Sequence, residues 1–397
     1  MTTADLGRDS LSVWLLALGQ LILYAGSYYS FPAVLPFLEA ETGWSKASLA
    51  AGPSVGFLLM AGLTMLSGRL VDRGFGGELL VGAPVLAALG LCFLALARSP
   101  AEWIAAWALI GVAQAGCLYE TCFSFLTRRL GTGARSAITQ VTLIAGFSGT
   151  VTFPLGHILG QAMGGQAALW VFAGLVLATA VPLNLVAVIR LRRRARAAGL
   201  SAAPDQPGAL AAALKRPEFW AIAGIMGLIW LNHGILLTYV LELFADRGAS
   251  AVLAAGAAAF IGPAQVVGRL GLMLAGARIS TMRATLASLV SAVLAVALLW
   301  SAGLSVYLIL GFALLHGAAM GLLSILRPLL TVEVLGRTGF GAISGAVSVP
   351  ALLGSAAAPA AGALLLQLGG TSFVYGSCLA MTGLALLAGV WLARRGI

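Results

Sequence analysis

Long apolar runs separated by short polar interruptions are the dominant pattern of the chain. A helix needs about 20 predominantly apolar residues to cross the hydrocarbon core of a bilayer, and runs of this length recur throughout the 397 residues. They predict twelve membrane-crossing helices, at residues 11–37, 46–68, 79–97, 103–126, 138–160, 168–189, 218–243, 251–275, 284–301, 305–330, 342–366 and 371–393. Because the number of crossings is even, we expect both termini on the same side of the membrane.

The composition agrees with this pattern. Hydrophobic residues make up 60% of the chain and charged residues only 9%, whereas soluble globular domains carry about 25% charged residues. The formal net charge is +10, but no soluble segment interleaves basic and aromatic residues, so we do not expect nucleic-acid binding. We interpret the excess positive charge as loop charge that orients a membrane protein.

The distribution of Lys and Arg between the loops predicts the orientation. Lys46, Arg98 and Arg247 fall on one side, whereas the whole 190–216 segment falls on the other side with Arg73, Arg128, Arg129, Arg135, Arg278, Arg283, Arg337, Arg394 and Arg395. Since cytoplasmic loops are enriched in Lys and Arg, both termini are expected in the cytoplasm. The opening MTTADLGRDS lacks the cationic start of a signal peptide, so the first apolar run is expected to remain a membrane helix.

One long polar connection, RLRRRARAAGLSAAPDQPGALAAALKR, divides the spans into two sets of six. The sequence therefore predicts an N-terminal six-helix bundle (1–189), a cytoplasmic linker (190–216) and a C-terminal six-helix bundle (217–397). We interpret the five arginines between 190 and 196 as a topology anchor at the lipid headgroups.

The two halves share short matches at equivalent places. An offset of 200 residues lays Gly268-Arg269-Leu270 on Gly68-Arg69-Leu70, at the end of the second span of each half. An offset of 205 lays Gly321 on Gly116 and Leu335-Gly336 on Leu130-Gly131, in the fourth span of each half. Parallel repeats of this kind build transporters from two similar bundles, with the substrate site between them near the membrane midplane. We therefore expect two pseudo-symmetric halves.

The loop GRLVDRGFGG, residues 68–77, resembles the signature loop between spans two and three of the major facilitator superfamily. Gly68, Leu70, Asp72 and Arg73 match that signature, while glycines replace the basic pair near its end. The resemblance extends over essentially the whole chain and implies an all-α integral membrane protein with twelve transmembrane helices in two bundles. Glycines allow a tight turn, and Asp72 and Arg73 can pair with charges on a neighbouring helix end. We therefore predict that Gly68, Asp72 and Arg73 form a gate that latches one conformational state.

Within that superfamily, the chain looks most like the monocarboxylate-transporter-like branch, through the segments YAGSYYSFPAVLPFLEAETGWSKASLA and GPAQVVGRL. In those carriers an arginine at the position of Arg269 holds the substrate carboxylate. Two positions depart from the branch: Ala33 stands where its members have a lysine, and Gln265 stands where they have an aspartate. Both groups serve proton and substrate binding in those carriers, so the resemblance does not extend to a lactate-type proton symport.

Three ionisable residues lie within the predicted spans. Glu120 lies about six residues from the inner end of its span, Arg269 lies at a similar depth, and Arg327 lies close enough to the interface to snorkel. Charge at membrane depth is costly and marks a functional site by default. With Glu120 ionised, the two arginines leave one positive charge, which a monoanionic substrate would neutralise through the bidentate hydrogen bonds of arginine.

Protonation of Glu120 would leave room for a second negative charge, so Glu120 is the predicted proton-coupling residue. The alternative for these three residues is a structural Glu–Arg pair that locks helices together. The predicted substrate site also includes polar side chains on helices that line the cavity in this superfamily: Tyr28, Tyr29, Tyr119, Asn232, His233 and Gln265, beside Arg269 and Arg327. His233, as a lone histidine in an apolar run, is equally compatible with a packing role.

Three other classes of function have weaker support. Efflux of a neutral or cationic drug or metabolite is the first, and the positive charge of the predicted cavity argues against cations. His316 and Met320 form an HxxxM pair whose spacing suits soft copper ligands, but such a pair occurs once. The sequence contains no HExxH, GxSxG or nucleotide-binding loop, so we expect neither an enzyme nor ATP-driven transport. The four cysteines lie in apolar segments and are interpreted as core residues.

The sequence thus predicts a secondary active transporter that moves a small, monocarboxylate-like organic anion across a bacterial inner membrane by alternating access, with protons as the candidate coupling ion. Its expected partners are the anionic substrate and the lipid bilayer. We expect a monomer without a cofactor or a resident metal.

Overall fold

The computed structural model describes residues 3–197 and 208–395, and almost all of this backbone is helical. The chain forms two compact units. Unit 1 comprises Met1–Leu210 and Arg337–Ala346, and unit 2 comprises Ala211–Gly336 and Val347–Ile397. The predicted linker at 190–216 lies partly outside the described residues, and the predicted bundle boundaries stay predictions.

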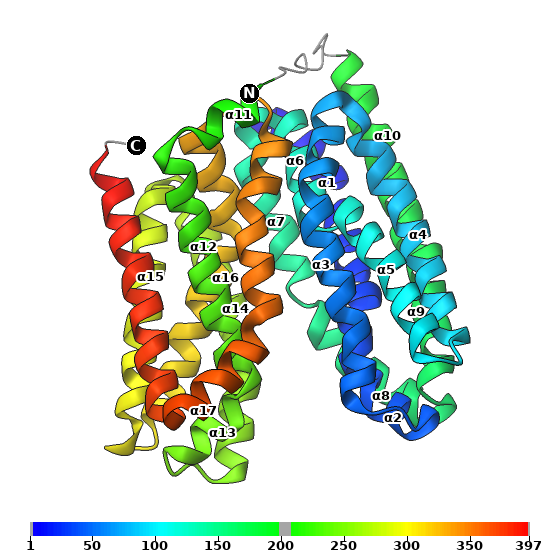
Figure 1. The fold of residues 1–397 in the computed structure, drawn as a ribbon. Coiled ribbons are helices and arrows are strands. Elements are labelled where there is room, and N and C mark those ends of the chain that lie inside the picture. Colours follow the sequence, from blue (N-terminus) through cyan, green and yellow to red (C-terminus); the bar gives the residue numbers. More distant parts are fainter. Residues whose placement is uncertain (1–2, 198–207, 396–397) are drawn as a thin grey trace. The chain divides into compact units, whose positions relative to one another are not determined.

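Unit 1 is built from helices joined by short connections (Figure 1). They are α1 (Thr3–Tyr24), η1 (Ala25–Tyr29), α2 (Ser30–Thr42), α3 (Lys46–Leu70), η2 (Val71–Phe75), α4 (Gly76–Leu96), α5 (Pro100–Cys117), α6 (Tyr119–Leu130), η3 (Gly131–Gly133), α7 (Ala134–Ala145), α8 (Ser148–Met163), α9 (Gly165–Leu175), η4 (Val176–Ala180) and α10 (Val181–Ala197). The first residues of α17 (Phe340–Arg394) also belong to this unit.

Unit 2 begins within α11 and contains most of α17. Its helices are α11 (Ala209–Leu214), α12 (Pro217–Thr238), α13 (Val240–Asp246), α14 (Ala251–Ala275), η5 (Gly276–Arg278), α15 (Thr281–Trp300), η6 (Ser301–Gly303), α16 (Leu308–Leu335) and α17. The short segments η1, η2 and η4 are π-helical turns, and η3, η5 and η6 are 3₁₀ turns.

Ten helical stretches of the described chain are long and apolar enough to cross a membrane, and two of them each hold two crossings. Ser48–Leu96 is 49 residues long and turns at Gly74, whose φ of 100° is readily adopted only by glycine. Phe340–Arg394 is 55 residues long and breaks at Gly369 and Gly370. Because one crossing takes about 20 residues, eight single and two double stretches give twelve crossings. The predicted twelve-helix architecture is therefore confirmed.

Several helices continue past the ends that the apolar pattern predicted. α6 ends at Leu130 rather than at 126, and α16 ends at Leu335 rather than at 330. A helix satisfies its own backbone hydrogen bonds whether its side chains are apolar or charged, so a charged last turn does not stop it. Glu120 consequently lies ten residues before the end of its helix rather than about six, and Arg327 lies eight residues before the end of α16.

The fourth span contains a break that the sequence pattern did not predict. α5 ends at Cys117 and α6 begins at Tyr119, with Leu118 in an extended conformation (φ −81°, ψ −166°). A break at membrane depth is tolerated when the released backbone groups find partners in the protein. Here the amide of Gln20 on α1 donates to the Cys117 carbonyl at 2.7 Å, so a side chain from another helix stabilises the break.

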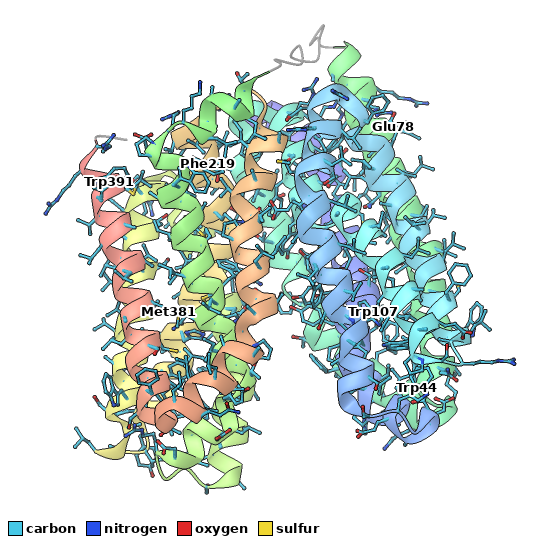
Figure 2. All side chains as sticks on the ribbon, viewed as in Figure 1. Trp44, Glu78, Trp107, Phe219, Met381 and Trp391 are labelled. Carbon is cyan, nitrogen blue, oxygen red and sulfur yellow. The ribbon has the colours of Figure 1, made fainter. Side chains whose placement is uncertain are left out.

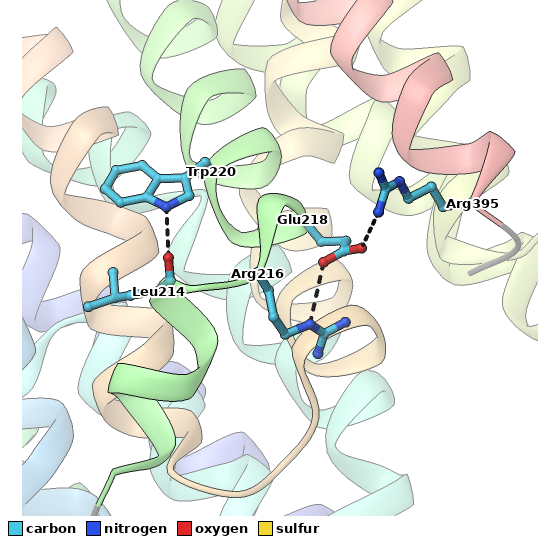
Figure 3. Close-up of polar contacts among 5 residues, drawn as sticks. All are labelled: Leu214, Arg216, Glu218, Trp220 and Arg395. Carbon is cyan, nitrogen blue, oxygen red and sulfur yellow. Dashed lines mark hydrogen bonds and ion pairs between the residues drawn. The ribbon is translucent and has the colours of Figure 1, made fainter.

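Ion pairs of the described residues lie near the ends of helices. In unit 1, the side chains of Trp44 and Glu78 lie at opposite ends of the unit (Figure 2). In unit 2, Glu218 joins the start of α12 to the end of α17 by accepting hydrogen bonds from Arg216 at 3.4 Å and from Arg395 at 3.3 Å (Figure 3). Between these ends, many large apolar side chains are exposed, as expected of lipid-facing helices.

Candidate functional site

The predicted gate loop makes a specific contact within unit 1. Both carboxylate oxygens of the buried Asp72 accept hydrogen bonds at 2.9 Å, one from the backbone N–H of Gly341 and one from that of Ala342, in the first turn of α17. The first N–H groups of a helix lack intrahelical partners, and an anion is favoured at that end. Asp72 therefore binds the backbone at the start of α17, and pairing of the gate with charges on a neighbouring helix end stays a prediction.

Glycines make this contact possible. A Cβ atom on Gly68 would lie 2.0 Å from the carbonyl oxygen of Gly341, and one on Gly341 would lie 2.2 Å from that of Gly68. Both positions therefore require glycine for the two backbones to approach so closely. Arg73, the other polar residue of the predicted gate, is exposed.

The predicted tyrosines lie in one aromatic cluster of unit 1. Tyr24 and Tyr119 have ring centroids 4.4 Å apart, Tyr28 and Tyr29 have centroids 5.0 Å apart, and Tyr24 and Tyr28 have centroids 5.7 Å apart. Tyr119 also stacks on Phe123 at 4.8 Å. Tyr24 was missed by sequence reasoning, although it lies four residues before Tyr28 and hence on the same helix face.

Glu120 lies beside this cluster, in the first turn of α6 directly after the break at Leu118. It is partly buried, and the hydroxyl of Ser344 lies 3.4 Å from its Oε2. An acidic side chain is favoured in the first turn of a helix, where the dipole is positive. The break thus gives Glu120 a helix start at a depth where an unbroken helix would have offered none.

Arg269 is a buried charge of unit 2. Its side chain is on α14 and is 7% exposed. The guanidinium donates from Nε to the carbonyl of Gly321 on α16 at 3.4 Å and from Nη2 to Oε1 of Gln265 at 3.3 Å. Both acceptors are neutral and both distances are long for a hydrogen bond. No carboxylate of the described residues forms an ion pair with Arg269.

Close packing of α14 against α16 determines where the Arg269 side chain lies. A Cβ atom on Gly321 would lie 2.2 Å from the carbonyl oxygen of Gln265, and one on Gly268 would lie 2.5 Å from the carbonyl oxygen of Ala318. α14 and α16 are therefore in backbone contact at this level. The same contact brings the Gly321 carbonyl within reach of the guanidinium.

The side chain of Arg327 is buried and does not reach the membrane interface. The sequence suggested that it could snorkel to the interface, but its side chain is only 7% exposed. α16 continues eight residues beyond it, so the guanidinium cannot reach the helix end. It lies instead over the ring of Trp230 on α12, with 5.9 Å between Cζ and the ring centroid, within the range of a cation–π contact.

Two histidines that are 83 residues apart in sequence meet in unit 2. Nδ1 of His233 on α12 lies 2.8 Å from Nε2 of His316 on α16, and the two rings are stacked. The HxxxM motif had suggested that His316 acts with Met320, but its ring nitrogen is bonded to His233. The neighbouring Asn232 is buried and donates to the carbonyl of Cys378 on α17 at 3.2 Å. The amide of Asn232 is therefore engaged in helix packing.

Membrane-crossing helices with charged side chains buried within them are typical of membrane transporters. The chain belongs to the Major Facilitator Superfamily, because the model of that family matches residues 16–348. It is a multi-pass membrane protein of a family whose members are transporters and generally not enzymes.

The fold is similar to those of solved transporters. A bacterial homologue of the iron transporter ferroportin, in an outward-facing state with soaked iron, has 19% identity and a TM-score of 0.76, and the match covers 96% of this chain and 99% of that one. An asparagine-to-alanine variant of the E. coli fucose:proton symporter FucP has 15% identity and a TM-score of 0.67, with 96% and 98% covered. At these identities the likeness shows the fold alone.

Curated relatives match only part of the chain. The multidrug resistance protein MdtH of Aeromonas hydrophila is 30% identical over 107 residues, which are 27% of this chain and 26% of that protein. The MdtH of Photorhabdus laumondii is 31% identical over 113 residues, covering 28% and 27%. The chain therefore spans about a quarter of the length of the curated relatives it matches. None of these comparisons singles out the monocarboxylate-transporter-like branch, which stays a prediction.

Proposed function

We propose that the protein is a secondary active transporter of a small organic anion in a bacterial inner membrane, and that Arg269 holds the carboxylate of that anion. The observation that carries this proposal is the buried guanidinium with only two long hydrogen bonds to neutral oxygens. Taking a charge out of water costs several kcal/mol unless an opposite charge or good hydrogen bonds compensate. An anionic substrate would supply that compensation.

The chemistry of the guanidinium favours a carboxylate as this anion. Its planar fork can form two parallel hydrogen bonds with one carboxylate group, which a point-like ammonium cannot. Gln265 accepts a hydrogen bond from Nη2 and the Gly321 carbonyl accepts one from Nε, so we expect Nη1 and the second hydrogen of Nη2 to bind the ligand. We propose that Arg327, the three tyrosines at 28, 29 and 119, and the polar residues Asn232, His233 and Gln265 contribute further to substrate recognition, and that Glu120 couples transport to protons.

The test is the conservative substitution Arg269→Lys in protein purified and reconstituted into liposomes. A thermal-shift screen of the wild type with mono- and dicarboxylates, amino acids and drugs first selects a ligand. A ligand at a hundred times its dissociation constant adds about 2.7 kcal/mol to the stability of the folded state. Arg269→Lys should reduce uptake of that ligand by at least about tenfold, because lysine keeps the charge but loses the fork.

Arg283→Lys is the matched control, because Arg283 is exposed at the start of α15 and should tolerate the same change. Wild-type uptake by a well-folded Arg269→Lys variant would contradict the carboxylate-binding role.

Efflux of a drug or metabolite is the second candidate function. It is favoured by the partial similarity to multidrug resistance proteins and by the tyrosine cluster beside Glu120, since aromatic faces and a carboxylate together attract organic cations. The two functions respond differently to mutation. Export of a lipophilic cation should be lost in Glu120→Gln and should survive in Arg269→Lys, whereas anion transport should be lost in Arg269→Lys.

A further inference from the structure

We propose that His233 and His316 together form a proton-binding site that takes up one shared proton within unit 2. The 2.8 Å separation of Nδ1 of His233 and Nε2 of His316 is a hydrogen-bond distance. One of the two nitrogens therefore carries a hydrogen and the other accepts it. The pair is neutral when it holds two ring hydrogens and singly charged when it holds three.

The outer nitrogens of the pair differ in their surroundings. Nδ1 of His316 is buried and has no hydrogen-bond partner among the described residues, and the whole His316 side chain is 0% exposed. His233 is partly exposed. A proton can therefore enter at Nε2 of His233, while the hydrogen on Nδ1 is donated to Nε2 of His316. Transfer along that hydrogen bond then moves the charge to the inner ring, where Nδ1 keeps its hydrogen.

Two opposing effects act on the proton bound by the histidine pair, so that it can be both taken up and released. Burial penalises the imidazolium, since a charge leaves water. A hydrogen bond from an imidazolium to a neutral imidazole is charge-assisted and stronger than one between neutral rings, which offsets part of that penalty. A second proton would leave two facing N–H groups and two positive charges at 2.8 Å, so the pair binds one proton and no more.

Charged groups on the surrounding helices also affect protonation of the pair, because basic groups oppose an added positive charge and acidic groups favour it. α14 packs against α16 at Gly317, next to His316, and its charged side chain is Arg269, whose Nε binds the carbonyl of Gly321 about 7.5 Å farther along α16. The other titratable groups of the packed helices are Glu218 on α12, Glu242 and Asp246 on α13, Arg283 on α15, Arg327 and Glu333 on α16, and Tyr375, Cys378 and Arg394 on α17. Arg269 is therefore the charge that should oppose protonation most.

An anion bound to Arg269 would remove this opposition, and by linkage a proton on the histidine pair would strengthen anion binding by the same factor. At this separation the effect is on the order of tenfold in affinity. This consequence rests on the proposed anion transport, whereas proton binding by the pair does not.

A metal ion shared by the two rings fits the geometry less well. Nitrogens bound to one zinc ion at 2.0–2.1 Å in tetrahedral geometry are about 3.3 Å apart, and these two are 2.8 Å apart. No group of three or more His, Cys, Asp or Glu side chains that could hold a metal occurs in the described part of the chain.

Close packing of α12 against α17 restricts the position of His233. A Cβ atom on the adjacent Gly234 would lie 2.4 Å from Cβ of Ala358 on α17.

The test uses the full chain labelled with ¹⁵N-histidine in lipid nanodiscs, with no transport substrate. The sequence contains 3 histidines, and the exposed His157 on α8 is the internal control. His157→Gln assigns its signals, so the remaining signals belong to the pair even if variants of the pair fail to fold. The pH is lowered from about 8.5 to about 4.5, which brackets the ordinary imidazole titration.

We expect the signals of His233 and His316 to move together in a single step that takes up one proton. His316→Gln should leave His233 titrating alone, with its midpoint displaced by roughly one pH unit or more. Three results would overturn the proposal: a pair that stays neutral over the whole range, two separate protonation steps, or signals that respond to added Zn²⁺ and not to pH. Because no anion is present, none of these results depends on the proposed function.

Discussion

Arg269 and Glu120 are both charged side chains in membrane-crossing helices, but their partners differ. Arg269 has two long hydrogen bonds to neutral oxygens, whereas Glu120 lies at a helix start, close to the hydroxyl of Ser344 and beside a tyrosine cluster. The dipole at a helix start stabilises a negative charge. Proton coupling through Glu120 stays a prediction.

The substitution Glu120→Gln tests this at the level of one residue, because glutamine imitates the protonated carboxyl group permanently. We expect it to abolish accumulation driven by a pH gradient, so that the internal substrate concentration only equilibrates with the external one. Homo-exchange of labelled substrate should continue, since it needs no net proton movement. Proteoliposome uptake with and without an imposed gradient measures both activities. If Glu120→Gln still concentrates substrate, Glu120 is structural, and the histidine pair becomes the remaining candidate for proton coupling.

At the scale of elements, backbone contact between α14 and α16 decides where the buried Arg269 lies. A Cβ atom added at Gly268, Gly317 or Gly321 would lie within 2.5 Å of a backbone carbonyl oxygen of the facing helix. Small residues at helix interfaces allow such approach in membranes, where packing rather than burial from water drives association. The same contact supplies the Gly321 carbonyl to Arg269.

Gly321→Ala should therefore separate α14 from α16. The added methyl group would lie 2.2 Å from the carbonyl oxygen of Gln265, and overpacking of this kind costs about 1–3 kcal/mol. We expect a lower unfolding temperature and weaker thermal protection by the ligand, because Arg269 loses its backbone partner. Gly271→Ala on α14 is the control, since no heavy atom lies within 4 Å of its added Cβ. Equal unfolding temperatures for the two variants would contradict the proposed packing role.

For the whole molecule, we predict that the contact between Asp72 and the start of α17 takes part in the transport cycle. It lies within unit 1, while α17 itself continues into unit 2. A hydrogen bond to a charged group contributes about 1.5–3 kcal/mol, which corresponds to roughly a ten- to hundredfold change in the balance between two conformations. The predicted gate thus has the strength needed to bias that balance.

Asp72→Asn should slow substrate exchange by about tenfold or more and leave substrate affinity nearly unchanged. The amide group of asparagine would replace one acceptor oxygen and face a backbone N–H, so one of the two hydrogen bonds at 2.9 Å would be lost. Exchange rates in proteoliposomes and ligand-induced thermal shifts measure the two quantities. Glu78→Gln is the control, because its carboxylate pairs with a partly exposed Arg192, and such pairs contribute little. A collapse of affinity with normal exchange would disprove the gate.

The sequence by itself determined the fold class, the number of crossings and the family. The length of an apolar run and the residues of GRLVDRGFGG are local properties, and a bilayer of fixed thickness turns run length into span number. The sequence also identified Arg269 and Glu120, because charge inside an apolar run is visible without coordinates. The depths of Glu120 and Arg327 in the membrane were predicted less accurately, because α6 and α16 continue through charged residues.

Only the tertiary structure decided which of these residues have partners. Asp72 and Gly341 are 269 positions apart, and His233 and His316 are 83 apart, so no local pattern could pair them. The break at Leu118 also depends on a distant helix, because Gln20 supplies the hydrogen bond that the Cys117 carbonyl loses. Likewise, Arg327 is buried because α16 extends past it and Trp230 on α12 covers its guanidinium. Such partners arise from helix packing, which brings together side chains whose separation along the chain carries no information about their distance in space.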